Sequence, residues 1–198
     1  MGNRPGAVRA DEEMKNINKE AAENAFKTRK KKLDIFLQER GFIKYKTNSY
    51  IRRNEIDVLE YIDLQKERYG SKTFTVNYSL IPLYVQHDFL SFDLGERLGE
   101  LICNKDVWWD YAEENAATVS FQNIIDAIKE FLLTYFDQCS VDEGIKKELL
   151  KEKKEREKYG GRLSDTQQAW LNVIDNHADC DEIIQENIKV LNLPSRIK

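Results

Sequence analysis

The sequence predicts an α+β domain in which an antiparallel β-meander packs against helices, with additional helices toward the C-terminus. Residues 42–85 alternate apolar and polar side chains in runs separated by short turn signals, which is the pattern of antiparallel strands. On both sides of this block, apolar residues recur at three- and four-residue steps, which is the period of helices. Helices grouped before and after an antiparallel sheet favour the α+β class.

The chain before the meander predicts a tail and then a long helix. Residues 1–10 show no apolar period, and we interpret them as a flexible tail. Asp11 can cap a helix whose apolar stripe continues to Leu37. Gly41 stands where a helix often ends in a left-handed residue, so the helix is expected to stop there.

Three alternating runs predict the strands of the meander. The first, residues 42–53, is divided by a turn at Thr47-Asn48; the second covers residues 55–69, and the third covers residues 72–85. In the third run one face is apolar, and the opposite face carries Thr73, Thr75, Asn77 and Ser79. A strand with this period has one dry face and one face that is wet or functional.

Residues 86–117 show no regular period, and the chain after them predicts helices. The strongest helical pattern covers residues 121–135, with Ser120 as its N-cap. Ser140 with Glu143 predicts a further helix, and 13 of the 17 residues from 142 to 158 are charged, so most of its circumference would face solvent. Shorter helices are expected to start at Ser164 and Asp179. The predicted organisation is a tail at 1–10, an α+β domain at 11–139 and a helical extension at 140–198 packed on that domain.

Composition narrows the classes of function. The 31 basic and 35 acidic residues give a net charge of −4, which provides no general attraction to a nucleic acid. The three cysteines lie far apart and form no CxxC pair, so we expect a reducing cytoplasm rather than a disulfide framework. The sequence contains no secretory signal and no apolar run that could span a membrane, so a membrane is not an expected partner.

Two stretches carry a family resemblance. The first, GFIKYKTNSYIRRNEIDVLEYIDLQKERYGSKTFTVNYSL, has Gly-Phe, a tyrosine-bearing hairpin, Leu-Gln-Lys and Phe-x-Val-Asn in that order. The second, RLGELICNKDVWWDY, adds Arg-Leu-Gly and Asp-x-Trp-Trp. In this order the motifs resemble the bacterial family called domain of unknown function 4304, over about residues 33–136. The resemblance implies an α+β domain in a cytosolic bacterial protein, and it implies no activity.

The second stretch also supplies candidate binding residues. Trp108 and Trp109 are neighbours, so on a strand or a helix their rings point in different directions. We expect one ring to anchor the core and the other to be covered by the C-terminal helices or by a partner. Arg97 has two interpretations, an anion clamp or a salt bridge to Asp106 or Asp110.

A polar patch on the sheet would extend this candidate surface. Gln65 lies in the second alternating run and Asn77 on the polar face of the third, so paired strands can bring them together. Ordinary solvent-facing positions explain these two residues equally well. The tentative binding surface therefore consists of Gln65, Asn77, Arg97, Trp108 and Trp109.

The sequence shows no catalytic, cofactor or metal signature. His87 and His177 are the only histidines, and neither stands at a metal-ligand spacing, so we predict no metal and no cofactor. Glu96 and Glu100 could be nominated as acid and base, but the nomination says little in a chain with 35 acidic residues. The basic residues 27–32 and the hairpin with Tyr45 and Tyr50 could contact a nucleic acid, or they could simply be solvated charges that discourage edge aggregation.

These observations leave three hypotheses. The first is a non-enzymatic, cytosolic protein-interaction module, with an immunity or antitoxin-like role as one form of it. The second is an enzyme of unidentified type with a cleft near Arg97. The third is a weak nucleic-acid binder that uses the basic hairpin, which the net charge makes the least favoured. Sequence patterns give no indication of the oligomeric state.

Overall fold

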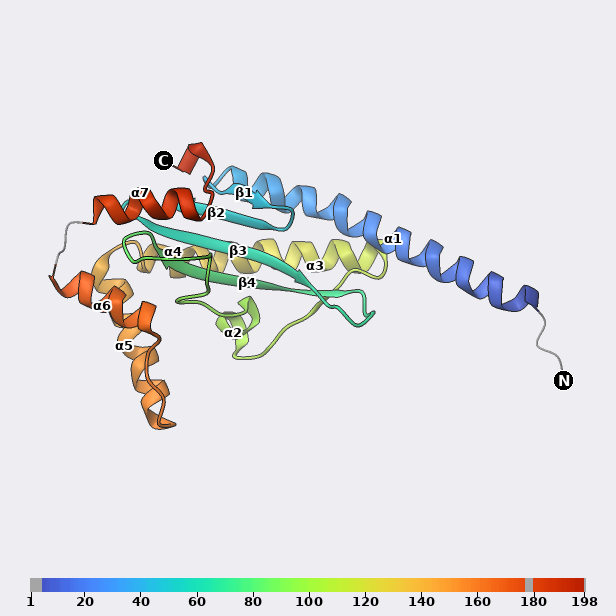
Figure 1. Cartoon of the computed structure of the whole chain (residues 1–198). Coiled ribbons are helices and arrows are strands. Elements are labelled where there is room, and N and C mark those ends of the chain that lie inside the picture. Colours follow the sequence, from blue (N-terminus) through green and yellow to red (C-terminus); the bar gives the residue numbers. More distant parts are fainter. Residues whose placement is uncertain (1–4, 177–179, 198) are drawn as a thin grey trace.

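The fold is α+β, as the sequence predicts. The computed structural model describes residues 5–176 and 180–197, with side chains described from residue 18 onward (Figure 1). Five strands form one antiparallel sheet in the order β1-β2-β3-β4-β5. They are β1 (Ile43–Lys46), β2 (Ser49–Arg53), β3 (Val58–Lys66), β4 (Thr73–Pro82) and β5 (Trp109–Asp110). Each connection within β1–β4 is a short turn, so the sheet is the expected meander with a fifth strand added from the irregular segment.

The strand β3 is shorter than the alternation predicts. It begins at Val58 rather than Glu55 because the chain before it makes a turn. The side-chain oxygen of Asn54 accepts hydrogen bonds from the backbone N–H groups of Ile56, at 3.2 Å, and Val58, at 3.0 Å. Asp57 takes a left-handed φ of 61° in this turn. An asparagine side chain that bonds its own following backbone competes in this way with strand pairing.

One long helix, α1 (Pro5–Gln38), precedes the sheet. It begins at Pro5 and not at Asp11, so residues 5–10 of the predicted tail are helical, while residues 1–4 lie outside the described residues. Proline suits the first helical position because its φ is fixed and its missing N–H would have no partner there. The helix ends as expected: Gly41 has a φ of +83°, and Phe42 N–H donates to the carbonyl oxygen of Leu37 at 3.0 Å.

A second helical rod covers the same face of the sheet as α1. It consists of α3 (Glu114–Ala127), a short π-helical stretch η1 (Ile128–Leu132) and α4 (Leu133–Gln138). The rings of Phe26 on α1, Phe74 on β4 and Phe121 on α3 pack together with centroid distances of 5.0 to 5.2 Å. Ser120 is not the N-cap of this rod: the helix begins six residues earlier, and the Ser120 hydroxyl donates to the carbonyl oxygen of Asp110 at 2.7 Å.

The C-terminal helices are α5 (Asp142–Lys158), α6 (Asp165–Asn176), α7 (Asp181–Val190) and the turn η2 (Ser195–Ile197). Figure 1 shows α5, α6 and α7 gathered at one end of the sheet. Ser164 and Gln167 form the predicted capping box of α6, with reciprocal bonds of 3.0 and 3.1 Å. The box predicted at Ser140 does not form, because the Ser140 hydroxyl donates to the carbonyl oxygen of Asp137 instead. Asp179 lies outside the described residues.

The outer edge of β4 is covered along most of its length. β5 pairs with Thr73 and Phe74, and farther along the strand the extended segment before α2 (Leu98–Cys103) takes over. Tyr78 N–H donates to the carbonyl oxygen of Glu96 at 2.9 Å, and Leu80 N–H donates to that of Leu94 at 2.8 Å. An edge paired in this way offers no open template for aggregation.

None of the helices in the described part of the chain combines the length and the apolar character that crossing a membrane requires.

Candidate functional site

The sheet has one face toward α1 and the α3–α4 rod and one face away from them. The sequence predicts that this second face is exposed to solvent along β4. In the structure only the middle of the face is partly exposed. Thr75 and Ser79 are 0 % exposed. The reason is that the irregular segment folds back over them, with the Thr75 hydroxyl donating to the carbonyl oxygen of Val107 at 3.0 Å. Asp63, Gln65 and Asn77 stay half-buried and open a polar strip between the covered parts.

Gln65 and Asn77 lie together in this strip. Asp63 pairs with Asn77 and Gln65 with Thr75 in the β3–β4 register, so Gln65 and Asn77 are diagonal neighbours on one face. The side-chain amide of Asn77 donates to Oε1 of Gln65 at 3.1 Å. Asn77 also forms an isolated antiparallel bridge with Arg97, which brings the irregular segment to the edge of the strip.

Arg97, Asp106 and Trp108 form a connected group at that edge. The guanidinium group of Arg97 is ion-paired with Asp106, so of its two interpretations the salt bridge to Asp106 is present. The indole N–H of Trp108 donates to the same Oδ2 atom of Asp106 at 3.1 Å. The guanidinium carbon of Arg97 lies 5.0 Å from the centroid of the Trp108 ring, within the range of a cation–π contact. We call Gln65, Asn77, Arg97 and Trp108 the Arg97 surface.

Trp109 does not belong to this surface. It is 8 % exposed, and its ring lies against Phe74 in the core, with the centroids 6.4 Å apart. Trp109 is the first residue of the short strand β5 and Trp108 directly precedes it, and neighbouring side chains along a strand point to opposite faces. The structure therefore separates the two rings as expected, with Trp109 as the core anchor and Trp108 half-buried at the surface.

Two exposed aromatic residues, which the sequence analysis did not single out, lie in the loop after β4. Phe89 is 71 % exposed and Phe92 is 50 % exposed. The Phe92 ring meets the edge of Tyr61 at a centroid distance of 5.4 Å. Tyr61 alternates with Asp63 and Gln65 on β3, so Phe92 is on the same sheet face as the Arg97 surface. The sequence contains a sign of these exposed aromatic residues: in the run HDFLSF the apolar residues fit neither the period of a helix nor that of a strand.

His87 and Asp93 form a buried polar group behind this loop. The Nδ1 atom of His87 is 3.7 Å from Oδ2 of Asp93, and its Nε2 atom is 2.7 Å from the carbonyl oxygen of Pro82. Burial raises the pKa of Asp93, whose Oδ2 atom has no hydrogen-bond partner in the described part of the chain. The backbone N–H of His87 donates to Oδ1 of Asn187 at 3.0 Å, which ties this loop to α7. His87 and Asp93 therefore form a buried polar pair with a structural role.

Metal ligands do not gather anywhere in the described residues: no group of three or more histidine, cysteine, aspartate or glutamate side chains there could hold an ion. His177 lies outside the described residues.

The basic hairpin uses its aromatic and charged groups for packing. Tyr50 is buried, and its hydroxyl donates to Asp34. The Tyr45 hydroxyl donates to the carbonyl oxygen of Leu191 at 2.8 Å. Arg52 is ion-paired with the buried Glu60, and Arg53 is ion-paired with Asp57. Both tyrosine hydroxyls and both guanidinium groups therefore already have partners within the chain.

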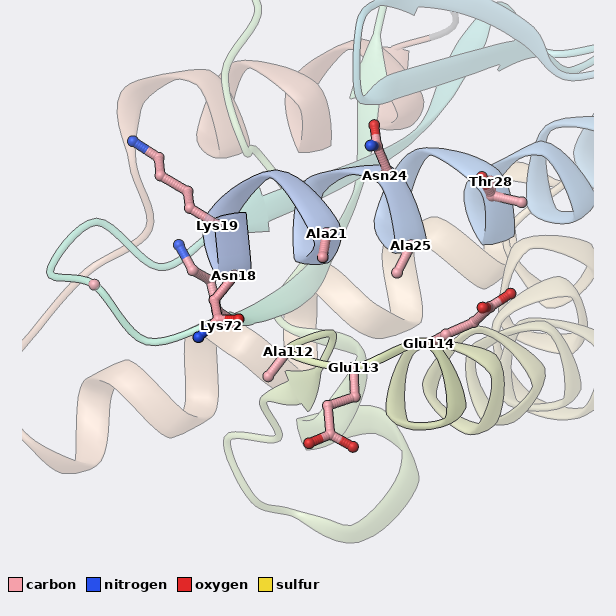
Figure 2. A pocket seen from close by; sticks show the side chains of 11 residues that line it. Asn18, Lys19, Ala21, Asn24, Ala25, Thr28, Lys72, Ala112, Glu113 and Glu114 are labelled. Atoms are coloured by element: carbon pink, nitrogen blue, oxygen red, sulfur yellow. The ribbon is translucent and has the colours of Figure 1, made fainter. Parts of the chain in front are cut away.

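A groove of about 890 Å³ runs between α1, the β3–β4 turn and the start of α3. Figure 2 shows small side chains, Ala21 and Ala25, facing the groove from α1. Its lining also contains the charged residues Lys19, Lys72, Glu113 and Glu114, of which Lys19 and Glu113 point away from each other in this view. No ion pair links these charged residues to one another in the described part of the chain, and the Arg97 surface is the stronger candidate site.

A comparison with protein-family models finds one match. The model described as domain of unknown function (DUF4304) matches residues 33–138. No curated protein and no solved structure matches the chain. The match covers more than half of the chain and includes the whole sheet, the α3–α4 rod and all four residues of the Arg97 surface. The helices α5, α6 and α7 and most of α1 lie outside it. The chain belongs to the DUF4304 family.

Proposed function

We propose that this chain is a cytoplasmic, non-enzymatic protein-interaction module that binds its partner through the Arg97 surface. The observation that carries this proposal is the position of Trp108. Its ring lies half-buried at the surface, held by a hydrogen bond to Asp106 and by the guanidinium group of Arg97. Tryptophan and arginine are the residue types most enriched where binding energy concentrates in protein interfaces.

The fixed geometry of this group supports binding because it reduces the entropy cost of association. A side chain that is already held in one rotamer loses less freedom when a partner covers it, and each immobilised side chain otherwise costs about 0.5–1.5 kcal/mol. Asp106 holds both Arg97 and Trp108, so the two side chains present one rigid unit. The exposed ion pair between Arg97 and Asp106 contributes only about 0–1 kcal/mol to folding. Recognition of a partner therefore explains the arrangement better than stabilisation of the fold does.

The surroundings of Trp108 have the composition of an interface. The amide groups of Gln65 and Asn77 offer hydrogen-bond donors and acceptors, and Asn77 is bridged to Arg97. Phe89 and Phe92 are exposed aromatic side chains in the loop after β4, and the Phe92 ring contacts Tyr61 on the same sheet face. Exposed aromatic residues next to satisfied polar groups are typical of recognition surfaces.

Two further observations favour binding over the alternatives. Arg97 is already ion-paired, and the buried His87–Asp93 group is closed to solvent, so neither offers a free acid, base or anion clamp to a substrate. The hairpin tyrosines that could stack a base are engaged with Asp34 and Leu191. An antitoxin-like role is one form of the proposed function, and it requires that the partner be a toxin.

The proposal is tested by isolating the complex from the native host. We expect a partner to co-purify with the wild-type chain at a fixed stoichiometry and to be lost from Trp108→Ala and from Arg97→Ala. Both residues lie outside the core, so each variant should unfold within about 1 kcal/mol of the wild type. Tyr159→Ala is the matched control, since Tyr159 is an exposed aromatic residue that directly follows α5. Retention of the same partner by both surface variants would refute the proposal.

A further inference from the structure

A pocket of about 580 Å³ lies beside the covered edge of β4, between the segment before α2, the helix α2 itself, α4 and α5. Glu96 and Arg97 are successive residues of extended backbone, so their side chains point to opposite sides of the sheet edge. Arg97 reaches the Arg97 surface, and Glu96 lines this pocket. The pocket is therefore separate from the surface of the proposed function, and the inference below does not rest on that function.

The charges that line the pocket are mostly negative. Five glutamates contribute, against the two cations Lys151 and Arg156: Glu96, Glu100, Glu148, Glu152 and Glu155. Both cations already form ion pairs within the chain: Arg156 with Glu152 at 2.6 Å, and Lys151 with Glu148 at 3.4 Å.

Two of these carboxylates lack a counter-charge. In the described part of the chain, neither Glu96 nor Glu100 forms an ion pair within 4 Å. Burial raises the pKa of Glu96, and the nearby charges of Glu100 and Glu152 raise it further, against a smaller opposite effect of the Lys151 charge. The two cations of the lining therefore offset only part of the negative charge of its five glutamates.

The floor of the pocket contains an unused hydroxyl group. Tyr78 lines the pocket although it is only 5 % exposed, and no hydrogen bond joins its phenolic oxygen to another residue that the structure describes. Burial raises the pKa of Tyr78, and the charges of Glu96 and Glu148 raise it further, which places those carboxylates around the phenol. The Tyr135 ring lies edge-on to Tyr78 with a centroid distance of 5.4 Å. A polar group on a side chain this deeply buried normally has a partner. The phenolic oxygen itself is not closed to solvent, so it is accessible from the pocket that Tyr78 lines.

We propose that this pocket binds a primary ammonium group carried on an aliphatic chain. An ammonium ion has three hydrogen-bond donors and no acceptor, which matches an unused phenolic oxygen beside the unpaired carboxylate of Glu96. The rings of Tyr78 and Tyr135, which both line the pocket, provide apolar surface for the methylene groups. The volume is within the range of about 300–1,000 Å³ that is usual for small-ligand sites.

The ammonium group has two possible sources, a free polyamine or a lysine side chain of another polypeptide. A calorimetric titration at low ionic strength with spermidine and, separately, with a short unstructured peptide of alternating lysine and alanine distinguishes them. We expect saturable binding of at least one probe at one site. Binding of spermidine alone indicates a free polyamine, and tighter binding of the peptide indicates a lysine side chain. A dissociation constant above about 10 mM for both probes would overturn the proposal.

Variants separate this site from general attraction of cations to an acidic protein. We expect Glu96→Gln/Glu100→Gln to weaken binding about tenfold or more, and Tyr78→Phe, which removes only the hydroxyl group, to weaken it about threefold to tenfold. The matched control is Glu182→Gln/Glu186→Gln, which removes two exposed charges on α7. Equal weakening by the control pair would overturn the proposal, and so would unchanged binding to Tyr78→Phe. Either result would mean that the cation is attracted only by the overall negative charge of the protein.

Tetramethylammonium provides a further check on the hydrogen bonds. It carries the same charge and has no N–H donor, so we expect its binding to be at least about tenfold weaker than that of a primary amine of similar size. Equal binding of the two cations would contradict the role of the Tyr78 oxygen.

Discussion

The indole N–H of Trp170 donates a hydrogen bond of 2.6 Å to the hydroxyl group of Tyr84. Trp170 lies on α6, outside the residues that the family model matches, and Tyr84 follows β4, inside them. Both residues are buried in the same hydrophobic core. The contact therefore makes α6 a structural part of the sheet's surroundings and not a loosely attached addition.

Removing this hydrogen bond should destabilise the protein, and the effects of changing Tyr84 and Trp170 should not be additive. Tyr84→Phe leaves the buried indole N–H without an acceptor, which should lower the free energy of unfolding by about 1–3 kcal/mol. Urea unfolding of Tyr84→Phe, Trp170→Phe and the double variant measures the coupling. We expect the double variant to lose less than the sum of the single losses, with Tyr159→Phe as an exposed control that loses almost nothing. Strict additivity would show that the bond contributes nothing.

Asn187 should be among the most sensitive polar positions of the chain. It is fully buried on α7, and its side-chain amide donates to the carbonyl oxygens of Leu83 and Val85, each at 2.7 Å. Asn187→Ala leaves these carbonyls and the His87 N–H unsatisfied, so we expect a loss of about 3 kcal/mol or more in the free energy of unfolding. Gln185→Ala, at an exposed position of the same helix, is the control. A loss of less than about 1 kcal/mol for Asn187→Ala would show that water replaces the amide.

The charge of Asp34 should stabilise the folded protein at neutral pH, and this contribution should be lost in acid. Burial alone would raise its pKa, but hydrogen bonds from Lys30 and Tyr50 and the charge of Lys30 lower the pKa of Asp34 overall. A carboxylate whose pKa is lower in the folded state stabilises that state above its unfolded pKa of 3.8, and the contribution is lost as pH falls through the folded pKa. Asp34→Asn should therefore be less stable than the wild type at pH 7.

The measurement is urea unfolding of both proteins between pH 7 and pH 3. We expect the difference in unfolding free energy to shrink as the pH drops below about 4, because the Asp34 carboxylate of the unfolded wild type then takes up a proton while that of the folded protein is still charged. A difference that stays constant over this range would show that the charge of Asp34 does not contribute.

Gly95 should tolerate no side chain, because the segment that it belongs to touches the backbone of β4. A Cβ atom at Gly95 would lie 2.0 Å from the carbonyl oxygen of Tyr78 and 2.5 Å from the Cα atom of Ser79. We expect Gly95→Ala to cost about 1–3 kcal/mol of stability and to loosen the pairing of Leu94 with Leu80, seen as faster amide exchange at Leu80. Gly161→Ala is the control, since its nearest contact would be 3.2 Å from Arg156. Equal stability of the two variants would contradict this packing.

The regular part of the fold follows from local patterns. Alternation predicts β1 to β4, Thr47-Asn48 forms the first turn, and Gly41 ends α1 with a positive φ. The capping box of Ser164 and Gln167 forms as its spacing predicts. Each of these features depends on residues close in sequence, so a short window contains the physical cause.

The candidate site depends on contacts that no short window contains. Ser120 has the side chain of an N-cap, but its hydroxyl meets the carbonyl oxygen of Asp110 instead. Thr75 is polar yet buried, because Val107 supplies a carbonyl acceptor from another part of the chain. The grouping of Arg97 with Asn77 likewise comes from an isolated bridge between distant segments. For the same reason the sequence could name Trp108 and Trp109 but could not say which ring is buried.

Site-specific photo-crosslinking in the native host tests most directly whether the Arg97 surface binds a partner. A photoreactive amino acid replaces Lys105, an exposed residue beside Asp106, and in a second protein it replaces Lys189, an exposed residue of α7. We predict one adduct of defined mass at position 105 that disappears when Trp108→Ala is added, and no such adduct at position 189. The same adduct at both positions, or an adduct at 105 that persists in the Trp108→Ala background, would contradict the account.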